Sequence, residues 1–175
     1  MSAYFEELCR TMAWLSERPR AVFVGQAVRF AGTSMFTTLR DVPMEKRIEF
    51  PVAEDMQLGL CTGMALNGDL PISIYPRINF LLLAVNQLVL HLDKLPLYSN
   101  DGYRPKVIIR TAIATDKPLD PQAQHIGDYS DALEAMLKTV TVVRLDRAKQ
   151  IFPAYRKAVE WDGPTLLIER TELYG

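Results

Sequence analysis

The sequence lacks the features that would place it in several large classes of protein. Its 175 residues carry a formal net charge of −1 and no basic cluster, so we expect neither a nucleic acid nor a membrane surface as a partner. The most apolar stretch, residues 80–92, is too short and too polar to span a bilayer. The N-terminus has no apolar signal-peptide run, and Cys9 and Cys61 form no CxxC motif. We therefore expect a cytoplasmic protein with two free thiols.

Common catalytic and phosphate-binding motifs are also missing. The chain contains no GxGxxG, GxxxxGK[ST], HExxH or GxSxG motif, and its two histidines do not form a metal site with the cysteines. We therefore predict no metal site on this chain. His91 lies within a long apolar helical pattern, where we interpret it as a core or edge residue. His125 follows a proline-broken loop and is the better candidate for a catalytic role.

Short apolar runs alternate with helical patterns along the whole chain. The runs are continuous stretches of valine, isoleucine and leucine, and so predict parallel strands that are covered on both faces. We expect a single α/β domain over residues 1–175, with a mainly parallel sheet in a three-layer α/β/α arrangement and an N-terminal helix at about residues 2–17. The strands are expected at residues 21–28, 70–76, 106–113, 140–145 and 164–170.

Further helices are expected between these strands. The helical patterns cover residues 56–66, 79–95, 128–139 and 146–160. We predict that Pro96 ends the second of these helices, that Asp128 or Ser130 caps the third, and that Pro153 kinks or splits the fourth. Residues 30–41 and 115–124 are expected to be loops.

Polar residues gather where the expected strands end. These places lie near Gln26, near Glu54, over Tyr75–Phe80 and over Ala112–His125. In parallel α/β sheets, ligands bind at the carboxyl ends of the strands. A binding site is therefore expected at this edge of the sheet.

The stretch FPVAEDMQLGLCTGMALNG, residues 50–68, places two carboxylates at the start of an apolar helix. A carboxylate at a helix N-terminus is favoured by the helix dipole by about 0.3–1 kcal/mol, which accounts for Asp55. Glu54 has two interpretations, because the residues before it are apolar. It is either a second helix-start charge or a buried acid that shares a proton with a ligand nitrogen.

Small residues recur on roughly one face of the same helix, at Gly59, Gly63 and Ala65. A glycine inside a helix costs up to about 1 kcal/mol relative to alanine, and the close approach of another helix commonly offsets that cost. The neighbouring helix belongs either to the same domain or to another subunit.

Together these segments resemble the pyrimidine-binding domain of thiamine-diphosphate-dependent, transketolase-like enzymes, and most closely the beta subunit of 2-oxo-acid dehydrogenases. The similarity rests on Glu54 followed by Gly59 and Gly63, on NFLLLAVNQLVLHLDKL at residues 79–95, on PKVIIR, on AQH ending at His125, and on PTLLIERTELYG. These blocks follow the order of the family and cover nearly the whole chain. The resemblance implies the thiamine-diphosphate-binding fold.

The resemblance also implies roles for individual residues. Glu54 matches the glutamate that hydrogen-bonds N1′ of the aminopyrimidine and helps drive the ring to its imino tautomer, which leads to the carbon nucleophile of the cofactor. Phe80 matches the aromatic residue that stacks on the pyrimidine, although a core phenylalanine looks the same in sequence. His125 matches an active-site histidine that assists proton transfer or holds the substrate carboxylate. Gln26 and Asn79 fall at cofactor-binding positions.

The sequence departs from the family pattern at several places. Asn79 stands where the family has an aspartate, and GQAVR at residues 25–29 replaces GEDVG. The glycine-rich loop before AQH is replaced by TAIATDKPLDP at residues 111–121. The GDG element and the downstream asparagine, which bind magnesium and diphosphate in the family, are absent. The chain also stops where the beta subunit would begin its C-terminal domain.

We therefore expect an enzyme subunit that supplies the pyrimidine-binding half of a split thiamine-diphosphate site. A separate diphosphate-binding, alpha-type subunit is expected to carry Mg²⁺ and to form a heterotetramer with this chain. The expected reaction is decarboxylation of a 2-oxo acid with transfer of the acyl or aldehyde unit. The alternatives are transketolase-like transfer of a two-carbon unit from a ketose phosphate, and a non-catalytic structural or interaction subunit, which the altered loops favour.

Overall fold

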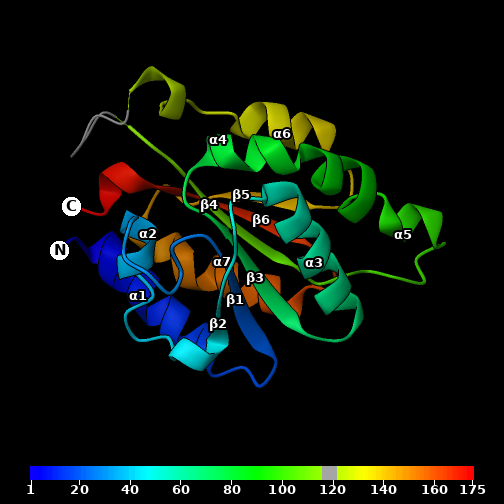
Figure 1. The fold of residues 1–175 in the computed structure, drawn as a ribbon, viewed down its shortest axis with the longest axis horizontal. Helices are drawn as coiled ribbons and strands as arrows, with labels where there is room; N and C mark the ends of the chain where they lie inside the picture. The colour runs from blue at the N-terminus through cyan, green and yellow to red at the C-terminus, as the bar shows by residue number, and fades with distance from the viewer. Residues whose placement is uncertain (116–121) are drawn as a thin grey trace.

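The centre of the molecule is a parallel sheet of six strands (Figure 1). The computed structural model describes residues 1–115 and 122–175. The strands lie in the order β2-β1-β3-β4-β6-β5, and every neighbouring pair is parallel, which confirms the predicted α/β class. The strands are β1 (Ala21–Gly25), β2 (Arg47–Glu49), β3 (Leu70–Tyr75), β4 (Ile108–Ile113), β5 (Thr141–Arg144) and β6 (Thr165–Arg170).

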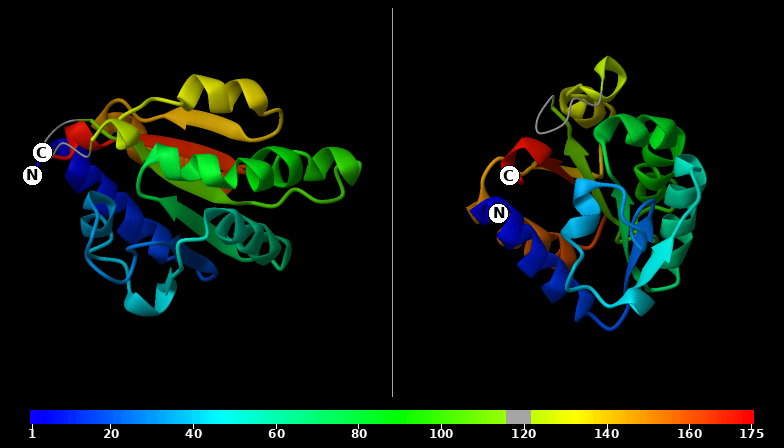
Figure 2. Two further views of the ribbon diagram at one scale, coloured as in Figure 1. Left: turned by 45° about the horizontal axis from the view of Figure 1, so that its top comes forward. Right: turned by 60° about the vertical axis from the view of Figure 1, so that its left-hand side comes forward.

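Helices cover both faces of the sheet, which confirms the predicted three layers (Figure 2). One face carries α1 (Ala3–Ser16) and α7 (Ala148–Glu160). The other face carries α3 (Glu54–Leu66), the segment Ile78–Leu92 and α6 (Ser130–Met136). Each face buries its own cluster of apolar side chains against the strands. This double burial is the reason that the strands read as continuous apolar runs in the sequence.

The single long helix predicted over residues 79–95 is wrong. The segment consists of α4 (Ile78–Leu81), a 3-10 turn η2 (Leu82–Ala84), a π-helix η3 (Asn86–Leu92) and then α5 (Leu95–Tyr98). Pro96 does not end a helix here, because it lies in the first turn of α5. A proline is tolerated at that position because the first turn leaves its backbone N–H groups without intrahelical acceptors.

No single helix in the described residues is long and apolar enough to cross a membrane. By length and composition alone, one pair of segments passes that test together, Ile78–Ala84 with Asn86–Tyr98, and the two are bent by 55°. Within this pair, Leu81, Leu88 and Leu92 are fully buried in the core of the domain.

The strand predicted at residues 21–28 ends earlier, at Gly25. Ala27 has a φ of 51°, in the left-handed region, and this turns the chain out of the extended conformation. The loop predicted at residues 30–41 contains the short helix α2 (Ser34–Thr37), which Thr33 caps. A 3-10 turn η1 (Met44–Lys46) then leads into β2.

The last two helices agree with the predicted segments, with differences at their ends. Pro153 lies inside α7 and does not split it. α6 begins at Ser130, and Oδ1 of Asp128 accepts a hydrogen bond from the backbone N of Ser130 at 2.9 Å. Of the loop predicted at residues 115–124, residues 116–121 lie outside the described part of the chain. A 3-10 turn η4 (Ala123–His125) follows them, and another, η5 (Thr171–Leu173), follows β6.

A buried ion pair joins the neighbouring strands β4 and β6. Nε of Arg110 donates to Oε1 of Glu169 at 2.5 Å and Nη2 donates to Oε2 at 2.9 Å, with both side chains fully buried. Tyr155 donates to the same carboxylate at 2.8 Å, and Tyr174 donates to it as well. Buried charges are tolerated when they are paired and hydrogen-bonded, so this cluster fixes α7 and the C-terminal segment to the sheet.

Candidate functional site

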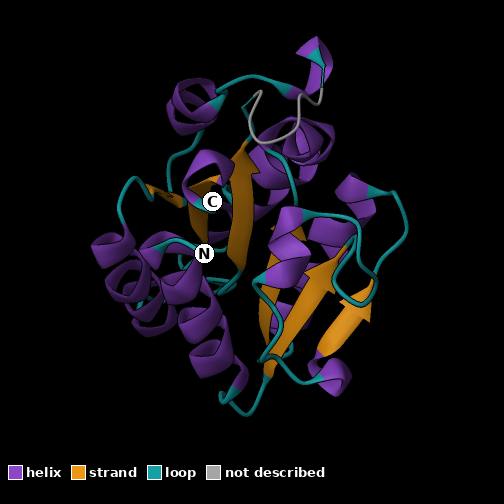
Figure 3. Ribbon diagram, turned by 90° about the vertical axis from the view of Figure 1, so that its left-hand side faces the viewer, coloured by secondary structure: helices purple, strands orange, loops and turns teal. Residues whose placement is uncertain are grey.

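The predicted site edge, at the carboxyl ends of the strands, lies at the same end of the molecule as both chain termini (Figures 1 and 3). The loop after β1 and the start of α3 bring two of the predicted residues together there. Nε2 of Gln26 donates to Oε1 of Glu54 at 3.0 Å. Oε2 of Glu54 accepts no hydrogen bond from any residue that the structure describes. One carboxyl oxygen is therefore held, and the other is available to a ligand.

Glu54 is buried, with 5% of its surface exposed, and its surroundings fix its position. The hydroxyl of Tyr75, at the end of β3, donates to the backbone carbonyl of Glu54 at 3.2 Å. Burial raises the pKa of Tyr75, so its hydroxyl stays protonated and remains a donor. The amide of Gln57 donates to Oγ of Ser73 at 3.0 Å and to the carbonyl of Ile74 at 3.1 Å, which ties α3 to β3. Glu54 is thus a buried acid on a fixed helix, and its chemical role stays a prediction.

A second carboxylate holds the loop that carries Gln26. Glu49, the last residue of β2, accepts a hydrogen bond from the backbone N of Ala27 at 2.6 Å through Oε1. Its Oε2 accepts from the backbone N of Val28 at 2.9 Å and of Arg29 at 2.8 Å. Backbone amides that converge in this way form an anion-binding turn, and here the anion is a side chain of the same protein.

Arg47, two residues before Glu49, holds the rest of that loop. Its buried guanidinium donates to the backbone carbonyl of Val28 at 3.1 Å, to that of Val42 at 3.1 Å through Nε, and to that of Leu39. Burial lowers the pKa of Arg47 from its ordinary value. Alternate residues of a strand share a face, so Arg47 and Glu49 act on the same side of β2. These two side chains are named the β2 clamp below.

The other predicted residues form a second group, at the ends of β3 and β4. Nδ2 of Asn79 lies 3.1 Å from Nδ1 of His125. The rings of Phe80 and His125 meet edge to face, with centroids 5.5 Å apart and planes at 76°. Nε2 of Gln124 lies 2.9 Å from Nε2 of His125. An amide nitrogen only donates, and a neutral imidazole has one acceptor nitrogen, so the two contacts are not both hydrogen bonds in either tautomer of His125. They place Asn79 and Gln124 beside the two ring nitrogens of His125.

A cavity of about 780 Å³ opens beside the second group. Its wall is built from the loop at residues 31–37, from Pro76, Arg77 and Phe80, and from residues after β4 and β6. This volume lies in the range of small-molecule sites. Phe80 lines the cavity, whereas Gln26, Glu54, Asn79 and His125 do not. Within the described residues, 1–115 and 122–175, no hydrogen bond joins the Gln26–Glu54 group directly to the His125 group.

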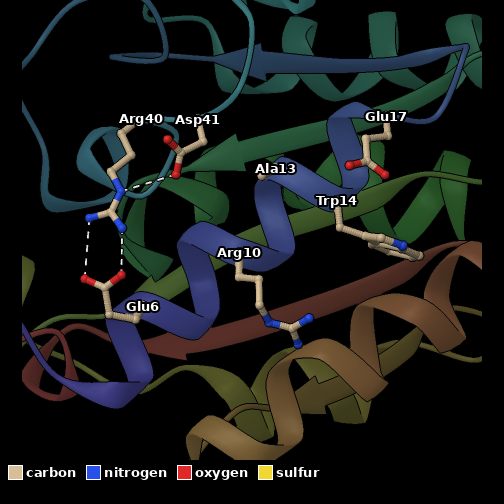
Figure 4. Close-up of a pocket in the computed structure, with 7 residues that line it drawn as sticks. All are labelled: Glu6, Arg10, Ala13, Trp14, Glu17, Arg40 and Asp41. Carbon is tan, nitrogen blue, oxygen red and sulfur yellow. Dashed lines mark hydrogen bonds and ion pairs between the residues drawn. The ribbon is translucent and has the colours of Figure 1, made fainter.

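Another hollow, of about 490 Å³, lies over α1 (Figure 4). Arg40 bonds there to Glu6 at 2.6 Å and to Asp41 at 3.3 Å, as Figure 4 shows. The other two charged groups of the wall pair with residues outside it, Arg10 with Glu7 and Glu17 with Arg18. This hollow therefore presents satisfied charges and is not a candidate site. In the part of the chain that the structure describes, no group of three His, Cys, Asp or Glu side chains is placed to hold a metal ion. His91 is exposed on η3 and belongs to neither group.

The helix behind Glu54 packs against its own domain at one of its glycines. A Cβ atom on Gly59 would lie 3.5 Å from the side chain of Gln87 in η3. The amide of Gln87 also donates to Oδ2 of Asp55 at 3.4 Å. A Cβ atom on Gly63 would meet no described atom within 4 Å beyond the backbone of its own helix. Gly59 therefore serves a contact within the chain, and Asp55 has a polar partner in addition to the helix dipole.

Apolar side chains are exposed on the same two helical segments. Met56 and Leu60 on α3 are 66% and 42% exposed, and Leu83 and Leu90 on the segment beside it are 64% and 53% exposed. These four side chains are named the α3 apolar surface. Clustered exposed apolar side chains are typical of surfaces that contact another protein.

Comparison with known proteins identifies the fold. The chain matches no protein-family model and no curated protein. Among solved structures it is similar to a split gene transketolase, solved as an inactive beta4 tetramer, with a TM-score of 0.72 and 19% identity over 97% of this chain and 51% of that one. The chain has the fold of this transketolase chain. It is also similar to a protein from Mycobacterium smegmatis described as thiamin diphosphate-dependent, with a TM-score of 0.63 and 14% identity over 94% and 30% of the two chains.

These matches confirm the predicted transketolase-like, thiamine-diphosphate-binding fold. The chain spans about half the length of the split gene transketolase chain and less than a third of the Mycobacterium smegmatis protein. At 19% and 14% identity, the likeness concerns the fold and does not assign an activity. The roles of Gln26, Glu54, Asn79, Phe80 and His125 stay predictions.

The sequence did not predict the β2 clamp or Arg77 as parts of the site. For the clamp, a signal exists in Arg-Ile-Glu at residues 47–49, since opposite charges at alternate positions of a short strand lie on one face. For Arg77, the signal is a cation between the end of a buried strand and the start of the next helix. Both signals become specific only when the neighbouring loops are in place.

Proposed function

We propose that this chain is the pyrimidine-binding subunit of a split thiamine-diphosphate-dependent enzyme, in which Glu54 activates the cofactor. The observation that carries the proposal is the surroundings of Glu54, a buried carboxyl group whose Oε1 is held by Gln26 and whose Oε2 has no partner among the described residues. Such an oxygen suits a ring nitrogen with which it exchanges a proton.

The residues present fit the pyrimidine end of thiamine diphosphate. Phe80 offers an aromatic ring beside a cavity of suitable size, and Oε2 of Glu54 offers a proton-sharing partner. When bound, this cofactor supplies a carbon nucleophile for attack on a substrate carbonyl. The part of this chain is to stack on the ring through Phe80, to exchange a proton at Oε2 of Glu54, and to keep water away from that acid.

Neighbouring residues support these roles. Gln26 occupies Oε1 of Glu54, so that the exchange takes place at Oε2. His125, whose ring nitrogens lie beside the amides of Asn79 and Gln124, is the candidate to hold or move a proton on the substrate. Asn79 directly precedes Phe80 in the chain. We assign it to the cofactor-binding group because its amide lies beside His125, whose ring meets the ring of Phe80.

The proposal includes a partner chain. The diphosphate element of the family is absent from the sequence, so an alpha-type subunit would hold the diphosphate and Mg²⁺ in a heterotetramer. The split gene transketolase among the structural neighbours, solved as an inactive beta4 tetramer, supports a division of the enzyme between chains. The α3 apolar surface is the candidate contact with another subunit, because Met56, in the first turn of α3, is two-thirds exposed.

Reconstitution with a candidate partner tests the proposal. Calorimetric titration of thiamine diphosphate and Mg²⁺ should show tight binding to the pair and none to this chain alone. Glu54→Gln should leave assembly intact and lower turnover by about 10²–10⁴-fold, the usual contribution of a general acid–base. Glu45→Gln, at an exposed acid on the turn before β2, is the matched control. Tight binding by the isolated chain would refute the split site, and normal turnover of the Glu54 variant would refute the role of that residue.

Two reactions are considered for such an enzyme. The resemblance to beta subunits favours decarboxylation of a 2-oxo acid with transfer of the acyl or aldehyde unit. The split gene transketolase among the structural neighbours favours ketol transfer. Supplying the reconstituted pair with pyruvate, branched 2-oxo acids and ketose phosphates separates them. A non-catalytic subunit remains the alternative if none of these substrates reacts and the Glu54 variant behaves as the parent.

A further inference from the structure

The cavity beside Phe80 is lined by a charged side chain that has no partner among residues 1–115 and 122–175. Arg77 lies between β3 and α4 and lines this cavity. Its guanidinium makes no hydrogen bond or ion pair with any residue in the described ranges. The two buried guanidinium groups behave differently, since Arg47 bonds to backbone carbonyls and Arg110 to Glu169. Arg77 is thus a half-buried cation that lines a cavity and has no counter-charge in the part of the chain that the structure describes.

The rest of the cavity wall supplies no neutralising acid. Over the described residues, no aspartate or glutamate side chain lines the cavity. The wall instead presents phenylalanine rings, small apolar groups and hydroxyl-bearing residues, among them Phe5, Phe36 and Ser34. A charge beside apolar walls interacts more strongly with an opposite charge than it does on an open surface, because the effective dielectric constant is lower. The wall therefore favours an anion with an apolar or polyhydroxylated body.

Arg77 is also connected rigidly to the residue on which the cofactor ring is predicted to stack. The backbone N of Phe80 donates to the backbone carbonyl of Arg77 at 3.1 Å, within the turn that begins α4. Both side chains line the same cavity. An anion bound by Arg77 would therefore be held at a fixed position relative to Phe80, which is what orientation of a substrate requires.

We propose that this cavity binds the anionic group of the substrate and that Arg77 recognises it. The substrate class is then an acid whose charged group is a planar carboxylate or a tetrahedral phosphate, since a guanidinium pairs with either through two parallel hydrogen bonds. This inference rests on the proposed function for the identity of the reaction. The recognition itself is a property of this chain and is measurable without cofactor or partner.

Anion binding by the isolated chain is the first test. NMR spectra of the ¹⁵N-labelled protein are recorded during titration with sodium phosphate and with sodium acetate, with sodium chloride at matched ionic strength as the reference. We expect saturable shifts at the side chain of Arg77 and at the amides of residues 77–80. These shifts should be lost in Arg77→Gln and kept in Arg147→Gln, which removes an exposed arginine at the start of α7.

The outcomes of this titration are distinct. Saturable shifts that depend on Arg77 support the proposal. Shifts of equal size in the parent and in Arg77→Gln, or equally large shifts around Arg147, would mean an adventitious ion only and would overturn the proposal. Shifts that do not saturate would also overturn it. The same titration of Glu54→Gln should match the parent. Failure of the proposed function is therefore visible separately, as normal turnover of that variant.

Kinetics of the reconstituted pair identify the source of the anion. In Arg77→Gln we expect KM for the anionic substrate to rise about tenfold or more, the effect of losing a hydrogen bond to a charged group, with kcat nearly unchanged. A rise for pyruvate and branched 2-oxo acids assigns the site to the carboxylate. A rise for a ketose phosphate but not for an unphosphorylated ketose assigns it to the phosphate. Arg77→Lys should restore part of the affinity that Arg77→Gln loses. A fall in kcat without a rise in KM would contradict a role of Arg77 in substrate recognition.

Discussion

Gln26 and Glu54 meet as a neutral amide and a carboxyl group, with 3.0 Å between Nε2 and Oε1. An amide donates to this oxygen without competing for the proton of the acid. The pair therefore contains one titratable group. A second acid at this distance would make the stability of the protein depend on the protonation of the pair.

Gln26→Glu should destabilise the chain near neutral pH, because two carboxylates at hydrogen-bond distance repel each other unless one keeps a proton. We expect the free energy of unfolding to fall by about 1–2 kcal/mol at pH 7.5. Most of the loss should be recovered near pH 4.5, where a proton is readily shared. Urea denaturation followed by circular dichroism measures both values. Gln26→Ala adds no charge, so its free energy of unfolding should show no such recovery at low pH. If the loss of stability in Gln26→Glu is the same at both pH values, the contact between residues 26 and 54 is contradicted.

Glu49→Ala should loosen the loop at residues 26–29. The substitution leaves three backbone amides without their acceptor. Hydrogen bonds to a charged group stabilise a fold more than hydrogen bonds between neutral groups do. We expect a loss of about 2–4 kcal/mol in the free energy of unfolding. Faster hydrogen exchange at the amides of Ala27 and Val28 should accompany it. The control is Glu45→Ala, at an exposed acid nearby. Unchanged exchange at those amides would show that Glu49 does not hold the loop.

Arg110→Met should be among the most destabilising single changes, because it leaves the buried carboxylate of Glu169 without a counter-charge. Breaking a buried ion pair in this way costs about 3–5 kcal/mol, which denaturant titration would detect. Replacing both partners, with Met at 110 and Leu at 169, should recover part of that loss. Arg104→Met removes an exposed arginine and should change stability little. A small effect of Arg110→Met alone would mean that water reaches the pair.

Asp93 connects the end of η3 to the turn before β5. Its Oδ1 accepts backbone hydrogen bonds from Lys138 at 2.8 Å, from Thr139 at 2.7 Å and from Val140 at 3.1 Å. The ammonium group of Lys94 bonds to Oδ2 at 2.6 Å. Burial acts to raise the pKa of Asp93, but these bonds outweigh it and hold the pKa below its ordinary value of 3.8. The carboxylate form is therefore the form that the fold stabilises.

This direction of the shift predicts how stability depends on pH. The contribution of Asp93 is fully present above its unfolded-state pKa and is lost as pH falls through the lower pKa of the folded state. Asp93→Asn should lower Tm at pH 7 and flatten the decline of Tm between about pH 4 and pH 2. Thermal unfolding across this range measures both effects. Asp162→Asn, at an exposed aspartate, should keep the decline of the parent. An equally steep decline for Asp93→Asn would contradict the shift.

The sheet was largely predictable because the core strands are buried on both faces. β3, β4 and β6 lie within the apolar runs that were expected to contain them. The segment at residues 79–95 was mispredicted because apolar spacing does not distinguish α-helical from π-helical turns. The early end of β1 carries no signal, since alanine is an ordinary strand residue and Ala27 takes its positive φ only in the folded chain.

The candidate site was predictable where a polar side chain follows the end of an apolar strand segment. Glu54 and His125 stood out as polar residues beside apolar segments, and the resemblance assigned them roles. The β2 clamp was not predictable in the same way. Glu49 acts on amides that precede it by about twenty positions, so its role depends on how the loop folds. The lack of a partner for Arg77 among the described residues likewise depends on how the surrounding loops fold.

The β2 clamp has a consequence for the dynamics of the site, because both of its residues lie on an edge strand. Among the described strands, β2 pairs with β1 alone, through the three positions Phe23–Arg47, Val24–Ile48 and Gly25–Glu49. Opening a sheet edge takes much less free energy than unfolding the whole domain. When β2 detaches, the loop at residues 26–29 loses the side chains that hold it, and the hydrogen bond from Gln26 to Glu54 loses its support. A partner that covers the free edge of β2 would therefore order the surroundings of Glu54 without touching that residue.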